Sequence, residues 1–245
     1  MSRPAPWASA VFAQAGVEAR LTARRGENLL AMIGVPIGVL LFIGGVVLPG
    51  SSVVARLPAV LALAIVASGF VNLGIATAYE RAYGVLKRLG GSPLGRSGLV
   101  AAKLAVVVAI GFAQVLAILA VAGLVLGWRA GPDASVVLIA LTTAVGASAF
   151  AGLGLVIAGT LRPETALVVA NLLFLLAVGF GGALLPMAGL PAPLADVVRL
   201  LPLAALTDAF AVALGSAGDV LRPLAILAAW AIAAVLVAAR TFRWD

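Results

Sequence analysis

Residues 29–50 read LLAMIGVPIGVLLFIGGVVLPG and contain no charged side chain. An α-helix needs about 20 apolar residues to cross the hydrocarbon core of a bilayer. The rest of the chain is similar, since 64% of its 245 residues are hydrophobic, 10% are charged and the mean hydropathy is +1.22. Soluble domains carry roughly 25% charged residues, so the sequence predicts an integral membrane protein. Strand-like alternation is absent, and lipid requires backbone groups to be satisfied internally, so the expected fold class is all-α.

Six apolar runs of this kind predict six transmembrane helices in a single domain over residues 1–245. The runs cover residues 29–50, 57–78, 104–128, 134–161, 165–185 and 223–239. Between and beside them we expect a cytoplasmic interfacial segment at 1–28, a charged loop at 79–98, an outer segment at 186–222 and a cytoplasmic tail after the last span. The N-terminal segment has no apolar stretch typical of a signal peptide, so we expect no cleavage there.

The basic residues indicate the orientation. Twelve of the 16 Lys and Arg residues fall on one face, in the N-terminal segment, the loop at 79–103, Arg162 and the tail. Cytoplasmic loops are enriched in Lys and Arg, so both termini are predicted to be cytoplasmic in a bacterial cytoplasmic membrane. The net charge of +7 is explained in the same way, and no nucleic-acid partner is expected.

The segment between the fifth and sixth runs is apolar but interrupted by prolines. It holds Pro186, Pro191 and Pro202. Proline breaks helices, and the segment is too apolar for a solvated loop, so we expect short re-entrant helices in the outer leaflet. Asp196 and Arg199 are spaced to pair on one helix face. The alternative is a seventh span broken at Pro202, which would place the C-terminus outside.

Residues 79–93 read YERAYGVLKRLGGSP and form the main charged interruption. On a helical wheel, residues 79–89 separate into one apolar and one polar arc, and 90–93 are helix terminators. The pattern alone permits a helix lying on anionic lipid, a docking helix for a cytoplasmic partner, or a loop whose pattern is accidental.

The order of residues in this loop resembles that of ABC-2 type transporter permeases. The match is Glu80-Arg81-x-x-Gly84-x-Leu86-Lys87-Arg88-Leu89-x-x-Ser92-Pro93, with Val85 where that family usually has Thr. The resemblance implies a coupling helix that fits a groove on an ATP-binding subunit. The residues expected to couple the two subunits are Tyr79, Glu80, Arg81, Tyr83, Gly84, Leu86, Arg88, Leu89, Ser92 and Pro93. Leu86, Leu89 and Tyr83 would anchor this helix, while Glu80, Arg81 and Arg88 would orient it.

The chain has no phosphate-binding GxxxxGK[ST] motif, so it is not expected to be an enzyme by itself. ATP and Mg²⁺ would bind to separate ATPase subunits, two copies of which the resemblance implies. Six spans are half the usual number for such exporters, so a second permease copy, identical or not, is also implied. The other partners expected are membrane lipids.

The resemblance places the substrate path at the interface of the two permeases, along spans one, two and five. Asn72 and Asn171 are therefore the candidate path residues, although the sequence without the resemblance favours a bond between helices for Asn72. The remaining lining would be apolar, which favours an amphiphilic or lipophilic substrate such as a drug, a lipid or a lipid-linked glycan.

Two other classes of protein stay open at this point. A secondary, ion-coupled transporter usually keeps ionisable groups at mid-membrane, where Asp208 is the acid nearest to a path. Its alternative role is that of a capping or surface acid after Thr207. A non-transporting accessory subunit is the second class. With neither Cys nor His, the chain can form no disulfide, no imidazole base and no Cys/His zinc site, and we expect no metal or catalytic residues.

Overall fold

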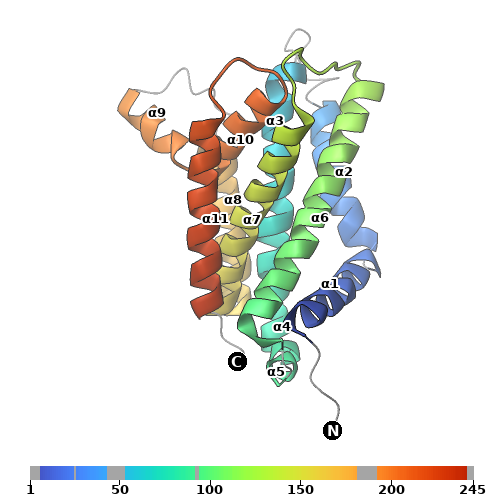
Figure 1. Cartoon of the computed structure of the whole chain (residues 1–245), viewed down its shortest axis with the longest axis vertical. Coiled ribbons are helices and arrows are strands. Elements are labelled where there is room, and N and C mark those ends of the chain that lie inside the picture. The colour runs from blue at the N-terminus through green and yellow to red at the C-terminus, as the bar shows by residue number, and fades with distance from the viewer. Residues whose placement is uncertain (1–5, 25, 43–52, 92–93, 181–191, 242–245) are drawn as a thin grey trace.

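The computed structural model describes residues 6–24, 26–42, 53–91, 94–180 and 192–241. These residues form a bundle of helices and contain no strand, which confirms the all-α class (Figure 1). The end of the bundle that carries α5 (Val85–Gly90) is called the α5 end below, and the opposite end is called the α10 end after α10 (Pro202–Ala213).

Within the described residues, four helical stretches are long and apolar enough to cross a membrane. They are α3 (Val53–Val66) continued by the π-helix η2 (Ala67–Asn72) and α4 (Leu73–Ala82), then α6 (Gly95–Leu124), α7 (Val136–Thr160) and α11 (Leu221–Thr241). They correspond to the second, third, fourth and sixth predicted spans. The third begins earlier than expected, at Gly95, and ends before Trp128.

The first and fifth predicted spans correspond to shorter described helices. These are α2 (Gly26–Phe42) and α8 (Pro163–Phe180). Residues 43–50 and 181–185, which the sequence assigns to these spans, lie outside the described residues.

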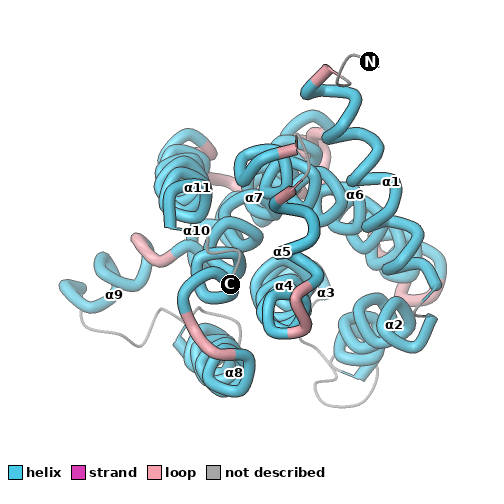
Figure 2. The backbone as a smooth tube through the Cα atoms, turned by 90° about the horizontal axis from the view of Figure 1, so that it is seen from below, coloured by secondary structure: helices cyan, strands magenta, loops and turns pink. Residues whose placement is uncertain are grey.

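Helix α7 lies at the centre of the bundle, between α6, α11 and the α3–α4 stretch (Figure 2). Glycines make this close packing possible. A Cβ atom on Gly154 would lie 2.7 Å from the carbonyl oxygen of Gly69, and one on Gly152 would lie 2.9 Å from the Cβ of Ala234. Helices without side chains at the contact can approach until their backbones touch, which is a common way to pack helices in lipid.

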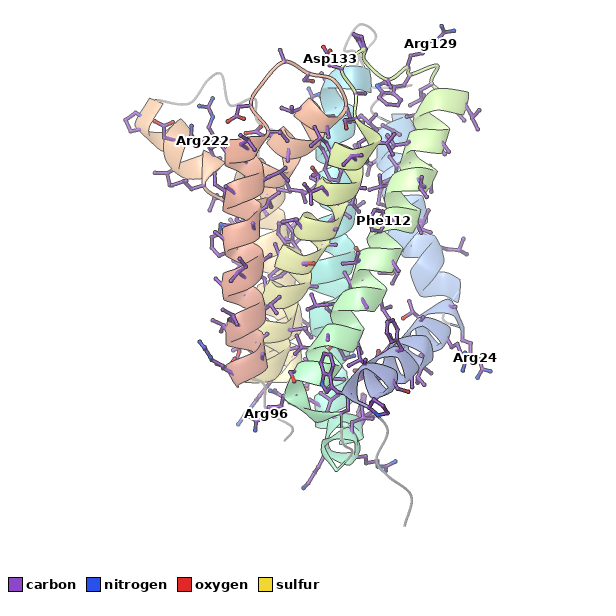
Figure 3. The ribbon with its side chains drawn as sticks, viewed as in Figure 1. Arg24, Arg96, Phe112, Arg129, Asp133 and Arg222 are labelled. Carbon is purple, nitrogen blue, oxygen red and sulfur yellow. The ribbon has the colours of Figure 1, made fainter. Side chains whose placement is uncertain are left out.

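Helix α1 (Trp7–Arg24) crosses the bundle obliquely at the α5 end and packs against α6 (Figure 1). None of its residues is buried, and the apolar side chains of Phe12 and Val17 are exposed. The charged residues labelled in Figure 3 divide between the two ends: Arg24 and Arg96 lie at the α5 end, whereas Arg129, Asp133 and Arg222 lie at the α10 end. The four arginines among them therefore lie on the two sides that the distribution of basic residues predicts.

The proline-containing segment forms two short helices in its described part, α9 (Ala192–Arg199) and α10, with Pro202 in the first turn of α10. The Asp196 and Arg199 side chains pair across 3.8 Å, as their spacing predicts. Helix α9 ends at Arg199 and α10 begins at Pro202 with only 12 residues, which is fewer than the roughly 20 that a span needs. Pro186 and Pro191 lie outside the described residues.

Candidate substrate groove and coupling segment

The helix predicted over residues 79–89 is not continuous. Helix α4 ends at Ala82, Gly84 adopts the left-handed conformation with φ 71°, and α5 begins at Val85. Glycine takes up this conformation at little cost and is the usual residue where a helix ends. The prediction of one rigid helix is therefore wrong, and Gly84 is a corner between α4 and α5.

The corner changes which side chains of α5 face outward. Leu86 is fully buried in a core cluster with Leu99 of α6 and Leu155 of α7, so it is not available as the predicted anchor on a partner. Leu89 is partly buried against the same cluster. The exposed side chains within residues 83–89 are those of Tyr83, Val85, Lys87 and Arg88. Ser92 and Pro93 lie outside the described residues.

Two of the predicted orienting residues are engaged within the chain. The guanidinium of Arg81 donates a hydrogen bond to the carbonyl oxygen of Leu161, directly after α7. The carboxylate of Glu80 accepts from the ammonium of Lys103, at 2.7 Å. Arg88 remains exposed, so it keeps the expected surface position.

Lys103 is the centre of a buried ion cluster that sequence reasoning missed. It was assigned to the cytoplasmic loop, but it lies in the third turn of α6 with only 2% of its side chain exposed. Its ammonium contacts Glu80 at 2.7 Å and Glu18 of α1 at 3.1 Å. The cluster therefore ties α1, α4 and α6 together. The signal in the sequence was the presence of only two lysines, one of which directly precedes an apolar run.

The π-helix η2 was also not predicted. Its Ser68 hydroxyl donates to the carbonyl oxygens of Ala64 and Ile65, both at 3.1 Å. A side chain thus provides a hydrogen-bond donor for two carbonyl groups of the preceding turn. Its last residue is Asn72. π-Helical turns inside α-helices are rare and occur often at functional sites.

A large groove of about 1100 Å³ runs along one side of the bundle. Its walls are α2, the α3–α4 stretch and α8, and Figure 2 shows α2 and α8 on either side of α3 and α4. Asn72 and Asn171 both line it, so the structure brings the two predicted path residues to one cavity. The Asn171 amide donates to the carbonyl oxygen of Leu167 at 2.8 Å, within its own helix.

The rest of the groove is mostly apolar, with polar groups near its ends. Its apolar lining includes Met32, Val35, Val39, Val60, Leu63, Val71, Ile75 and Phe174. Arg56 lines it near the start of α3, while Tyr79, Glu80 and Tyr83 line it at the α5 end. The two tyrosine rings lie 6.0 Å apart between centroids.

A small cavity of about 60 Å³ adjoins this groove at the ion cluster. Glu18, Glu80 and Lys103 line it, together with Ser68 of the π-helix. Both hollows share Met32, Asn72, Ala76 and Glu80 in their walls. The carboxylate of Glu80 therefore borders the groove and the ion cluster at once.

Asp208 belongs to α10, which does not contribute to the walls of this groove. It borders a separate hollow with Arg199 and Arg222. Partial burial raises the pKa of the Asp208 carboxyl, and the positive charges of Arg199 and Arg222 act in the opposite direction. The structure thus places Asp208 beside two arginines and not in the groove walled by α2, α4 and α8.

The sequence matches one family model, described as ABC-2 type transporter, over residues 11–214. The chain belongs to this family. No curated protein matches the chain. As a member, it is a multi-pass membrane permease of an ABC transporter, and it is not itself the catalytic part. Permeases of this family work with ABC ATP-binding subunits.

Proposed function

We propose that this ABC-2 permease forms one half of an ATP-driven exporter for amphiphilic or lipophilic molecules in a bacterial cytoplasmic membrane. Two permease copies, identical or not, face one another across the groove between α2, α3–α4 and α8. Each copy contributes six spans, with both termini in the cytoplasm and α9 and α10 re-entering the outer leaflet. The observation that carries the proposal is the groove itself, walled by the first, second and fifth spans.

The dimensions and lining of the groove support this substrate class. Its lining runs along the α3–α4 stretch from Arg56 to Tyr83, which corresponds to about 40 Å at 1.5 Å per helical residue. A groove of that length extends across a whole bilayer. An apolar wall with polar groups near its ends fits a molecule with an apolar body and a polar head.

The α5 segment supports the coupling part of the proposal. Val85, Lys87 and Arg88 form an exposed, basic and partly apolar surface, here called the docking surface. A partner that pushes this surface moves the end of α4, because α5 follows it directly at Gly84. Arg81 and Glu80 then pass the movement to α7, α6 and α1.

Purification of the tagged chain from native membranes in mild detergent tests the pairing with an ATPase. We expect an ATP-binding subunit and vanadate-sensitive ATP hydrolysis in the eluate. We also expect both to be lost when Val85→Asp and Arg88→Glu alter the docking surface. A chain that elutes alone, and whose transport is abolished by a proton uncoupler instead, would indicate an ion-coupled transporter.

Cysteine cross-linking tests the arrangement of two copies, because the natural chain has no cysteine. If the two copies are identical, single cysteines at Val35 and Val39 of α2 are expected to give covalent dimers on oxidation, since a disulfide needs Cα atoms within about 7 Å. Leu116→Cys on the exposed face of α6 is the matched control and should stay monomeric. Dimers at Leu116 and none on α2 would place the interface elsewhere.

A further inference from the structure

We propose that the α5 end of the groove binds a positively charged group, so that the substrate is a cationic amphiphile. This site consists of Glu80, Tyr79 and Tyr83, supported by Glu18 and Lys103. The inference deepens the proposed function by naming the charge of the substrate's head group. Binding itself, however, requires only this chain.

The ion cluster carries an excess of negative charge. Among the side chains that the structure describes there, two carboxylates share a single ammonium, since both Glu18 and Glu80 contact Lys103. By this count one negative charge has no described partner, and both carboxylates are only partly exposed, at 14% for Glu18 and 23% for Glu80. Charges attract more strongly at low dielectric than in water, so this position favours a second cation.

The excess charge is accessible from the groove. Glu80 keeps 23% of its side chain exposed and lines the groove, whereas Lys103 is 2% exposed and lines only the small cavity. A molecule in the groove therefore contacts the carboxylate of Glu80 and does not contact the ammonium of Lys103 directly. This arrangement favours a cation and disfavours an anion at the α5 end.

The aromatic rings add a second contribution of the same sign. Tyr79 and Tyr83 line the groove next to Glu80, and their rings lie 6.0 Å apart with planes inclined by 31°. The face of an aromatic ring attracts ammonium groups, and pairs of rings beside a carboxylate suit quaternary or lipophilic cations. Tyr83 is 75% exposed, so its ring is not needed to fill the core.

The charged residue at the other end of the groove does not cancel this preference. Arg56 and Glu80 are separated by 24 residues of nearly continuous helix, or about 36 Å. Because the interaction between charges falls with distance, a cation held at Glu80 is affected far more by the adjacent carboxylate than by Arg56. Within the described lining, Glu80 is thus the charged residue that a molecule meets at the α5 end of the groove.

Two lipophilic ions of nearly equal size and opposite charge test the proposal. Tetraphenylphosphonium and tetraphenylborate are titrated against the full chain in nanodiscs of phosphatidylcholine, with empty nanodiscs as background. We expect saturable binding of the phosphonium ion, and a loss of at least fivefold in its affinity in Glu80→Gln. Binding of the borate ion should not weaken in this variant.

Controls separate charge from folding. Glu164→Gln removes an exposed carboxylate in the first turn of α8 and should leave phosphonium affinity unchanged. If Glu80→Gln fails to fold, Tyr83→Leu decides the question, because it removes an exposed ring and is expected to weaken phosphonium binding about threefold. Unchanged phosphonium affinity in the folded variants, or equal effects on both ions, would overturn the proposal. Because no ATPase is present, such a result leaves the exporter assignment intact, and loss of the ATPase partner leaves this site intact.

Discussion

The guanidinium group of Arg81, in the last turn of α4, donates a hydrogen bond to the carbonyl oxygen of Leu161, the residue that follows α7. The bond closes the C-terminal end of α7, where carbonyl groups have no partner within the helix. It also fixes the end of α4 to the central helix of the bundle. Two segments 80 residues apart in the chain are therefore joined at the α5 end.

Arg81→Gln should weaken this connection. A hydrogen bond from a charged group contributes roughly 1.5 kcal/mol, so we expect a fall of about that size in the free energy of unfolding. In the complex with the ATPase, substrate stimulation of ATP hydrolysis should fall as well. Thermal unfolding and ATPase assays measure the two effects. For the stability measurement Arg88→Gln is the control, since Arg88 is exposed, and equal destabilisation by both would show that the bond to Leu161 is unimportant.

Lys103→Met should destabilise the chain strongly. It leaves Glu18 and Glu80 close together without the ammonium that both contact, and removing one partner of a buried ion pair costs about 3 kcal/mol or more. Lys87 is the other lysine of the sequence and is exposed, so Lys87→Met is the matched control. The triple variant with Glu18→Gln and Glu80→Gln should recover most of the lost stability. Failure of that rescue would argue against an electrostatic cause.

Gly154→Ala should disturb the contact between α7 and the π-helix. The added Cβ would lie 2.7 Å from the carbonyl oxygen of Gly69 and 2.9 Å from that of Phe70, so backbone must shift. Overpacking of this kind costs typically 1–3 kcal/mol, and we expect a lower unfolding temperature. Gly16→Ala in α1 serves for comparison, because no described atom lies within 4 Å of the new methyl group. Similar unfolding temperatures for both variants would mean that α7 and the π-helix separate easily.

Val85→Asp and Leu86→Asp introduce the same charge at neighbouring positions and should have different effects. Leu86 is fully buried, so an aspartate there places an unpaired charge in the core and should unfold the α5 region. Val85 is 45% exposed, so its variant should keep the unfolding temperature and lose the ATPase subunit on purification. Retention of the ATPase by a folded Val85→Asp variant would place the docking surface elsewhere.

Apolar composition alone carried the prediction of the fold class, because lipid admits few ways to satisfy a backbone. The run at 134–161 was therefore found within two residues of the limits of α7, whereas the run at 57–78 falls four residues short of the helical stretch 53–82 at each end. The direction in which individual side chains point depends on backbone dihedral angles, which the pattern of apolar and polar residues does not reveal. A wheel drawn over residues 79–89 assumes uniform helical rotation, and the left-handed Gly84 ends that rotation after one turn. Leu86 consequently faces the core and not the partner.

Of the candidate site, the two asparagines of the groove were predicted from the sequence, and the buried ion cluster was not. Asn72 and Asn171 came from a family resemblance, and the structure brings both to the same groove. Lys103 was misplaced because charge counting treats every lysine near a span as a solvated one. Its burial depends on two carboxylates, Glu18 and Glu80, which lie 85 and 23 residues away along the chain. Pairings over such distances leave no periodic signal.

The π-helix has a geometrical consequence for the whole second span. The hydrogen bonds of a π-helix span five residues instead of four, so a π-turn contains one residue more than an α-turn. In an α-helix one residue corresponds to about 100° of rotation around the axis. The half of the span after Asn72 is thus out of phase with the half before it by more than a quarter turn. An uninterrupted α-helix carrying the same sequence would aim the carboxylate of Glu80 away from α6. The extra residue therefore sets a fixed angle between the α3 half and the α4 half of this span.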